Sequence, residues 1–483
     1  MRRVPSVLVA TAALAVLGCG SPAVGVRPLR TADLVVGGES NFPEPVIGGD
    51  LNGDGRDDVV IPTRDGLVVV LGRRRFPRRA RVGALGGTFA IRVRAHPVLP
   101  QCCHAAPDEI LTPATALGDL DGDGLDELGI GGLGYDGELA RVYGSGTTPT
   151  ATAYVLFGDR ATGFVDLSRD RSRVAAITTG LRSDQSATVA LQRLTDGRLL
   201  AVANQQSSYP DGCGVGMHPL PVRIRPLTAI LPRVRRGERI DLAAGGSAVH
   251  RLRAAVHGGV VTGAAALGRQ LSVTGDLPLQ RGTCVVTRHF ARIGSPAEFE
   301  RGGRGARAPR DLREVAQAGG DFDGDGRTDL AGALLRGGEA WVTVYTGRRP
   351  PARLGPWAAE EDAPSVRFVG DVNRDGRDDL LVTNDFQVTV VSGAAHPGRD
   401  VTPCRTVVSR DVGRDTDSVA GDVDGDGTPD LVLTRSLTGS GARIIFGPID
   451  PAGRLRPERV VRRAAARYAA RNLVAGNASC SDA

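Results

Sequence analysis

Apolar residues in this chain come in short runs that are separated by turns rich in glycine and aspartate. Residues 59–61, 67–71, 380–382 and 431–433 are such runs, made of Val, Ile and Leu. Short β-branched runs bounded by turn residues are typical of strands, whereas helices need longer segments with a 3.6-residue period. With 66 Gly and 30 Pro in 483 residues, the composition also favours strands and turns. The pattern therefore predicts an all-β protein.

One nine-residue pattern, Asp-x-Asp/Asn-x-Asp-Gly-x-x-Asp/Glu, occurs five times, starting at residues 50, 119, 321, 371 and 422. We name the copies loop 50, loop 119, loop 321, loop 371 and loop 422. Carboxylates at positions 1, 3 and 5 converge when such a loop wraps round an ion, and Gly at position 6 permits the positive φ of a sharp turn. Calcium accepts about six to eight oxygen ligands, and packing these acids together without a cation is unfavourable. The repeat predicts about five structural calcium ions, one for each of the five loops.

Each loop is predicted to bind its ion through side chains at positions 1, 3, 5 and 9 and through the main-chain carbonyl of position 7. The predicted metal-binding residues are Asp50, Asn52, Asp54, Arg56 and Asp58; Asp119, Asp121, Asp123, Leu125 and Glu127; Asp321, Asp323, Asp325, Arg327 and Asp329; Asp371, Asn373, Asp375, Arg377 and Asp379; and Asp422, Asp424, Asp426, Thr428 and Asp430.

The residues after the loops exclude one well-known class of calcium protein. An EF-hand needs a Glu at position 12 and a helix after its loop. Position 12 is instead Ile61, Ile130, Gly332, Val382 and Leu433, and each loop leads into a strand-like segment. EF-hands and dockerin-like modules are therefore excluded, and the loops are predicted to be turns that enter buried strands.

The repeat extends beyond the loop. A short strand ending in Gly precedes each copy, and a second strand, a turn and a third strand closing on Gly follow, as at 67–72, 153–158 and 442–447. This unit resembles the FG-GAP repeat of integrin α-subunit propellers and their bacterial relatives, over most of residues 34–448. The resemblance implies a β-propeller, in which sheets stack as blades around an axis and leave no long free edge. It also implies that the N-terminal run 32–36 completes the last blade.

The spacing of the copies predicts the number of blades. The first-position Asp residues are separated by 69, 202, 50 and 51 residues. If the blades in the 202-residue interval have about the first spacing, the interval holds two blades without the motif. Together with the five blades that carry the motif, this gives seven, the number that the resemblance implies. Three would fit at the later spacing, so an eight-bladed ring is the alternative. One eroded copy is visible at residues 194–198, and the other is expected between about 244 and 287.

The N-terminus has the features of an export signal. Arg2 and Arg3 precede a mostly apolar segment, and the sequence Val-Leu-Gly-Cys ending at Cys19 resembles a bacterial lipobox. We predict a lipoprotein signal peptide at 1–18, lipidation of Cys19, a linker at 19–31, the propeller at 32–450 and a tail at 451–483. A plain secretory signal is the alternative. The expected location is the cell envelope or outer surface, with the membrane contacted only through the lipid.

Cysteine and histidine usage gives no catalytic motif. Six cysteines remain after Cys19, and an even number in an exported chain favours disulfides, with Cys404–Cys480 as the preferred pair. The run Cys102-Cys103-His104 fits a disulfide-bearing loop better than a metal site. The seven His residues form neither an HExxH motif nor a close pair, and no nucleophile elbow is present. The sequence therefore predicts a protein that is not an enzyme.

The charge balance indicates the kind of partner. All 60 basic residues are Arg, and 18 of the 54 acidic residues are at positions 1, 3, 5 and 9 of the five loops, so a calcium-filled molecule would present a basic surface. The predicted function is a calcium-stabilised extracellular binding, adhesion or scaffold protein, with an unknown protein or an anionic glycan as its ligand and no nucleic acid. A polysaccharide lyase-like enzyme and a purely structural envelope lipoprotein are the alternatives. Binding is expected in the long connections 73–111 and 205–310.

Overall fold

The computed structural model describes residues 30–35, 45–63, 66–82, 90–94, 114–134, 152–167, 169–178, 187–194, 196–205, 227–242, 250–251, 260–267, 269–281, 284–301, 306–307, 319–336, 339–346, 352–358, 364–383, 388–395, 405–409, 418–435 and 441–449. The predicted signal peptide, the lipidation site Cys19, the tail and the Cys404–Cys480 pair lie outside these residues. Among the described residues, no helix is long and apolar enough to cross a membrane.

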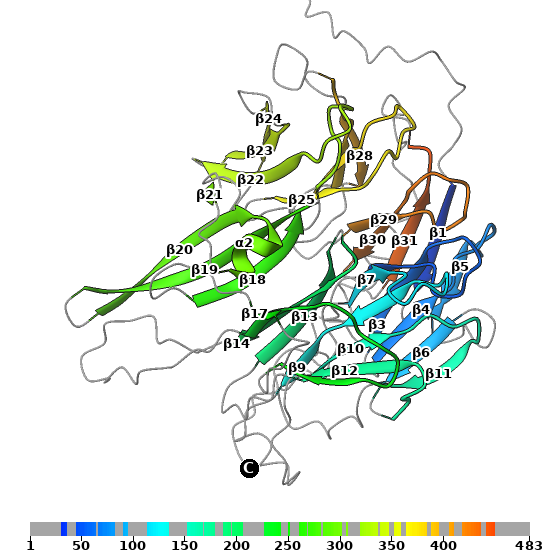
Figure 1. The fold of residues 1–483 in the computed structure, drawn as a ribbon. Coiled ribbons are helices and arrows are strands. Elements are labelled where there is room, and N and C mark those ends of the chain that lie inside the picture. Colours follow the sequence, from blue (N-terminus) through cyan, green and yellow to red (C-terminus); the bar gives the residue numbers. More distant parts are fainter. Residues whose placement is uncertain are drawn as a thin grey trace, which may run out of the picture.

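The described strands form seven sheets, which we number in chain order (Figure 1). Sheet 1 contains β2 (Val46–Gly49), β3 (Asp58–Thr63), β4 (Gly66–Val70), β6 (Ala90–Arg94) and β11 (Gly163–Asp166). Sheet 2 contains β7 (Ala114–Gly118), β8 (Glu127–Ile130), β10 (Thr152–Leu156), β12 (Val174–Thr178) and β16 (Arg239–Asp241). Sheet 3 contains β9 (Gly132–Gly134), β13 (Ala187–Arg193), β14 (Leu199–Gln205), β15 (Leu227–Leu231) and β17 (His250–Arg251).

The remaining sheets come from the second half of the chain. Sheet 4 contains β18 (Val260–Leu267), β19 (Gln270–Arg281), β20 (Cys284–Gly294) and β21 (Ala306–Arg307), with the short helix α2 (Pro296–Glu300) before its last strand. Sheet 5 contains β22 (Leu330–Arg336), β23 (Glu339–Tyr345) and β24 (Ala352–Ala358). Sheet 6 contains β25 (Ser365–Phe368), β26 (Leu380–Thr383), β27 (Val388–Val391) and β28 (Arg405–Ser409). Sheet 7 contains β29 (Ser418–Gly421), β30 (Asp430–Arg435), β31 (Gly441–Phe446), β1 (Arg30–Val35) and β5 (Arg79–Arg81).

The two ends of the described chain meet in sheet 7. Strand β1 runs antiparallel to β31, with a register from Arg30 opposite Phe446 to Val35 opposite Gly441. This pairing confirms the prediction that the N-terminal run completes the last sheet.

Three sheets receive their outer strand from the sheet that follows them in space. Strand β5 follows β4 of sheet 1 in the chain but pairs in parallel with β1 of sheet 7. In the same way, β11 follows β10 of sheet 2 but pairs with β6 of sheet 1, and β16 follows β15 of sheet 3 but pairs with β12 of sheet 2. The expectation that 73–111 is one long connecting loop is therefore wrong. It contains β5 and β6, and Val82, Ile91 and Val93 on or next to these strands are buried. The segment 205–310 likewise contributes strands to sheets 2, 3 and 4.

The apolar core is divided among the joints between sheets. Six clusters of buried side chains each contain residues of two consecutive sheets: 7 and 1, 1 and 2, 2 and 3, 3 and 4, 5 and 6, and 6 and 7. Strand β3 shows how one strand serves two joints, because successive side chains point to opposite faces. Val60 packs against sheet 2, whereas Val59 and Ile61 pack against sheet 7. Each apolar run is thus buried on both faces.

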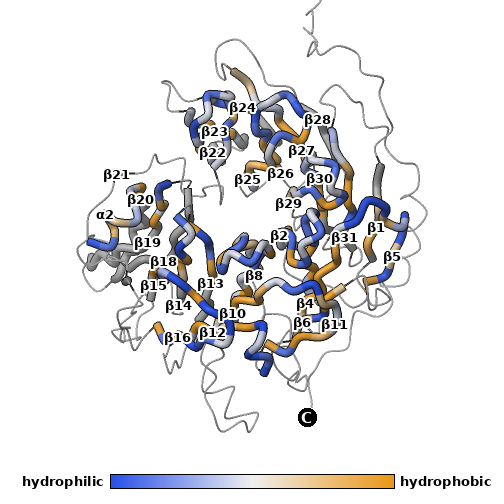
Figure 2. The backbone as a smooth tube through the Cα atoms, turned by 45° about the vertical axis from the view of Figure 1, so that its right-hand side comes forward, coloured by the Kyte–Doolittle hydropathy of each residue, from blue (hydrophilic) through white to orange (hydrophobic). Residues whose placement is uncertain are grey.

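The sheets follow one another in chain order around a common centre, as the second view shows (Figure 2). Sheets 3 and 4 occupy the long interval between loops 119 and 321, so the interval holds two sheets among the described residues. The eroded copy at 194–198 is the turn between β13 and β14, as predicted, with Gly197 at a φ of 82°. Sheet 4 spans residues 260–307 and lies later in the chain than the expected 244–287.

Candidate metal centres

The five acidic loops occupy equivalent places in five sheets. Four of them join the first and second strands of sheets 1, 2, 6 and 7. In sheet 5 the first strand is reduced to a single bridge, between Gly320 and Asp329, and loop 321 lies between these residues. The prediction that the loops are turns leading into buried strands is confirmed.

The first acid of each loop organises the turn. In loop 50, Oδ1 of Asp50 accepts hydrogen bonds from the amides of Gly53 (2.8 Å) and Asp54 (2.9 Å), and Oδ2 accepts one from Gly55 (2.7 Å). Each of the other four loops repeats the bond from position 6 to position 1. Positions 4 and 6 have positive φ, for example 74° at Gly53 and 78° at Gly55, which explains the two glycines. Loop 371 is the exception, because Arg374 stands at position 4 with a φ of 63°.

The acid at position 9 is buried and ties the loop to the third strand. Asp58 accepts hydrogen bonds from the amide of Leu51 in the loop (3.1 Å) and from that of Gly72 at the end of the third strand (2.8 Å). Asp379 and Asp430 make the equivalent pair of bonds. Position 9 therefore has a structural role in addition to its predicted role as a ligand.

Protonation of the position-9 acids is strongly perturbed. Burial, and then the charges of Asp54 and Asp50, raise the pKa of Asp58 to about 8. Burial and the other acids of each loop raise the pKa values of Glu127, Asp329, Asp379 and Asp430 to about 7. A cation in the loop would stabilise the ionised forms of these carboxyl groups.

Three loops bring their acids close enough to hold one ion. The carboxylate oxygens within each of three groups lie within 4.8 Å of one another: Asp119, Asp121 and Glu127; Asp321, Asp323 and Asp325; and Asp422, Asp424 and Asp430. Among the residues that the structure describes, Oδ1 of Asp329 is buried without a hydrogen-bond partner. An all-oxygen set of carboxylates with unused buried lone pairs fits a hard cation such as calcium.

Loops 50 and 371 offer one carboxylate fewer, because position 3 is Asn. Their backbone hydrogen bonds match those of the other loops, including the bonds from Asp375 and Gly376 to Asp371 (2.9 and 2.8 Å). In loop 371, the side-chain amide of Asn373 donates a hydrogen bond to Oδ2 of Asp375 (3.2 Å). Coordination by the position-7 carbonyls stays a prediction.

Position 8, which the repeat pattern left open, joins neighbouring loops. Oδ2 of Asp126 accepts a hydrogen bond from the amide of Asp50 (2.8 Å), and the Asp126 amide donates to the Asp50 carbonyl (2.9 Å). Asp57 binds Asp422, and Asp378 binds Asp321, through the same two bonds. We call this arrangement the position-8 clamp. Sequence reasoning missed it. Position 8 is Asp in loops 50, 119 and 371, and in each case the preceding sheet carries an acidic loop. It is Thr in loop 321, whose preceding sheet 4 has no acidic loop, and Pro in loop 422.

The clamp explains the glycine that precedes the loops. A Cβ atom on Gly49 would overlap Oδ2 of Asp126. The same atom on Gly421 would lie 2.7 Å from Oδ2 of Asp57, and on Gly320 it would lie 2.8 Å from Oδ2 of Asp378. The close approach of the two loops at these three joints therefore requires glycine, which has no Cβ atom.

Comparison with known proteins gives only distant likenesses. No family model matches the chain, and no curated protein does. Among solved structures, a protein of unknown function from Dyadobacter fermentans has a TM-score of 0.35 and 12% identity, over 70% of this chain and 95% of that one. The Photorhabdus luminescens Tc holotoxin pore has a TM-score of 0.27 and 12% identity, over 80% and 16%. The V. cholerae biofilm matrix protein Bap1 has a TM-score of 0.18 and 12% identity, over 86% and 64%. Likenesses of this size carry no argument about function.

Proposed function

We propose that the seven sheets are the blades of a calcium-stabilised β-propeller of the FG-GAP, integrin α-subunit-like kind, and that the protein is an exported binding or adhesion module. The observation that carries the proposal is the recurrence of one acidic loop, with a buried acid at position 9, at the same place in five sheets. The two-sheet core clusters and the pairing of β1 with β31 support a ring. Rings of this kind use their rigid frame to present a ligand-binding surface.

Calcium is proposed at all five loops as a structural ion. Each loop would place the ion among the position-1, position-3 and position-5 side chains, where it offsets repulsion among acids held by the fold. Metal analysis of calcium-equilibrated protein should find about five ions per chain, and a chelator should lower the melting temperature, while magnesium restores little of it. Absence of bound calcium together with a melting temperature that ignores the chelator would overturn this proposal.

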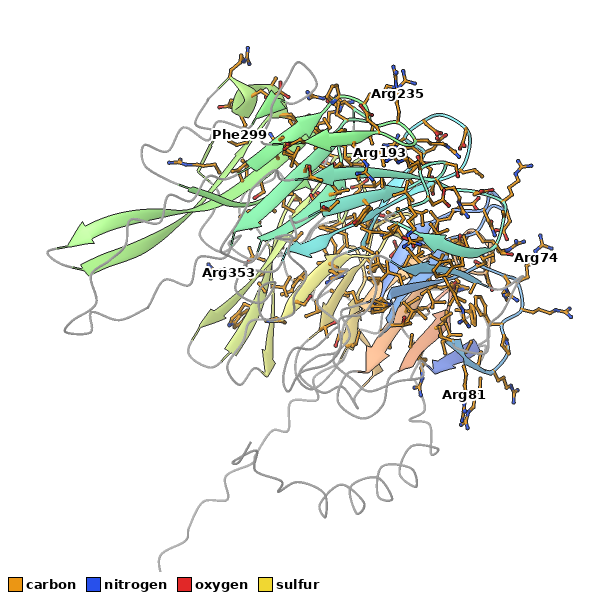
Figure 3. The ribbon with its side chains drawn as sticks, turned by 90° about the horizontal axis from the view of Figure 1, so that it is seen from below. Arg74, Arg81, Arg193, Arg235, Phe299 and Arg353 are labelled. Carbon is orange, nitrogen blue, oxygen red and sulfur yellow. The ribbon has the colours of Figure 1, made fainter. Side chains whose placement is uncertain are left out.

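The proposed partner surface is the arginine segment 73–81. Arg74, Arg75, Arg78 and Arg81 are exposed, and Arg74 and Arg81 point away from the sheets (Figure 3). The segment is held in place, because the ring of Phe76 packs on that of Phe446 with centroids 5.8 Å apart and β5 pairs with β1. Several exposed guanidinium groups on one segment suit repeated negative charges, such as those of an acidic polysaccharide.

The binding proposal is tested with a charge-matched pair of variants. One variant changes Arg74, Arg75, Arg78 and Arg81 to Gln, and the control changes four exposed arginines elsewhere to Gln: Arg171, Arg233, Arg235 and Arg269. Both should keep the calcium content of the wild-type protein. On immobilised polygalacturonate and dextran sulfate at physiological salt, the first variant should lose at least tenfold in affinity and the control much less. Equal losses would mean that net charge alone drives binding, and no binding by the wild-type protein would exclude this ligand class.

A further inference from the structure

In loop 119, one arginine from outside the loop pairs with two of the loop's acids. Nε of Arg236 lies 3.1 Å from Oδ2 of Asp121, and its Nη2 forms an ion pair with Oδ2 of Asp123. One guanidinium thus bridges positions 3 and 5, two of the predicted calcium ligands. The two contacts join residues that are 115 and 113 positions apart in the chain.

The position of Arg236 is set by the strand that passes from sheet 3 to sheet 2. Arg236 lies between β15 and β16, where the amide of Gly237 donates to the carbonyl of Val174 (3.2 Å) and the amide of Ala176 to that of Glu238 (2.9 Å). The guanidinium also lies 5.3 Å from the ring centroid of buried Phe157. The backbone is therefore fixed, whereas the side chain keeps 35% of its surface exposed and is able to swing into solvent.

The arginines near other loops are placed differently. Arg56 forms its ion pair with Asp54 (3.1 Å), and Arg377 forms its pair with Asp375 (3.9 Å), in both cases at position 5 of the arginine's own loop. Arg374 of loop 371 reaches Asp426 (3.3 Å), again at position 5. In loop 119, the converging acids are Asp119, Asp121 and Glu127, and Asp123 is turned to Arg236.

Sheet 3 explains why an arginine stands there. Its own turn at 194–198 is not an acidic loop, and at Gly118, where a position-8 acid sits in other joints, the structure places Arg193. Loop 119 therefore faces a neighbour that supplies positive charge.

We infer that Arg236 is an internal cation that competes with calcium for loop 119, so that the guanidinium weakens calcium binding by this loop and is released when the loop fills. The inference rests on the proposed calcium binding. Its physical basis is that Asp121 and Asp123 must exchange two charge-assisted hydrogen bonds for the ion.

The test is the change Arg236→Gln, with Arg235→Gln as the matched control because Arg235 is exposed and points outward from the sheets (Figure 3). Bound calcium is counted by equilibrium dialysis over a range of free calcium, and melting is followed in chelator and in calcium. In Arg236→Gln, one of the ions should bind at roughly tenfold lower free calcium than in the wild-type protein, since one lost charged pair is worth about that factor. The same variant should melt lower in chelator, because the acids lose their internal cation.

A second change assigns the shifted ion to this loop. Asp119→Asn combined with Asp121→Asn should remove one ion, and adding Arg236→Gln to that protein should then shift nothing. Lower stability in chelator without tighter calcium binding would show that Arg236 is only a structural contact and would overturn the inference, while the other ions still support the proposed function. A wild-type chain that binds no calcium would overturn both.

Discussion

The position-8 clamp can be tested by adding one methyl group at Gly49. This residue has a φ of 81°, and a Cβ atom on it would overlap the Asp126 carboxylate that binds the Asp50 amide. An alanine in the left-handed region costs about 1–2 kcal/mol, and loss of a hydrogen bond to a charged group costs about 1.5–3 kcal/mol. Gly49→Ala should therefore destabilise the protein by roughly 3–5 kcal/mol, the sum of these two effects.

The matched control is Gly197→Ala. Gly197 has nearly the same φ, 82°, but no atom lies within 4 Å of the added Cβ, so only the backbone strain of about 1–2 kcal/mol applies. Asp126→Ala should cost about 1.5–3 kcal/mol through the lost bond. In the double variant Gly49→Ala with Asp126→Ala, the clash is gone, so the two effects should not add.

The assay is urea denaturation in saturating calcium, together with hydrogen exchange of the amides in residues 49–55. Exchange should accelerate in Gly49→Ala and in Asp126→Ala, and stay at the wild-type rate in Gly197→Ala. If Gly49→Ala were no less stable than Gly197→Ala, or if the Gly49 and Asp126 changes added fully, the clamp would not hold the joint between sheets 1 and 2.

Three further predictions concern calcium, pH and the N-terminus. In chelator, the stability of the folded protein should fall as the pH rises from about 4 to about 8. The position-9 acids have raised pKa values of about 7 to 8 in the folded protein, so they bind protons there that the unfolded chain has lost. Melting experiments should show this slope, and saturating calcium should flatten it. Asp426→Ala should remove one calcium ion by metal analysis and lower the melting temperature in calcium without reducing binding at the arginine segment, because position 5 of loop 422 faces the ion. Cys19→Ser should abolish incorporation of labelled palmitate in a bacterial host, and labelling that persists would exclude Cys19 as the lipidation site.

Much of the local structure could be predicted from the sequence because it depends on neighbouring residues. The bonds from the loop amides to Asp50 span three to five positions, and the two glycines supply the positive φ that the turn needs. Apolar runs such as 59–61 alternate between two joints, since a strand has a period of two. The strand order within a sheet and the presence of two sheets in the long interval follow from the same repeat.

The contacts between sheets were decided by the tertiary structure. Asp57 contacts Asp422, which lies 365 positions away in the chain. The nine-residue pattern alone does not mark position 8 as different from a variable position. The outer strands β5, β11 and β16 pair with sheets to which the neighbouring sequence does not belong, so 73–111 could not be recognised as partly sheet. Arg236 reaches loop 119 because β16 is carried into sheet 2. A repeated sequence specifies each unit through local hydrogen bonds and periodicity, whereas which side chains meet at a joint depends on how the whole set of sheets packs.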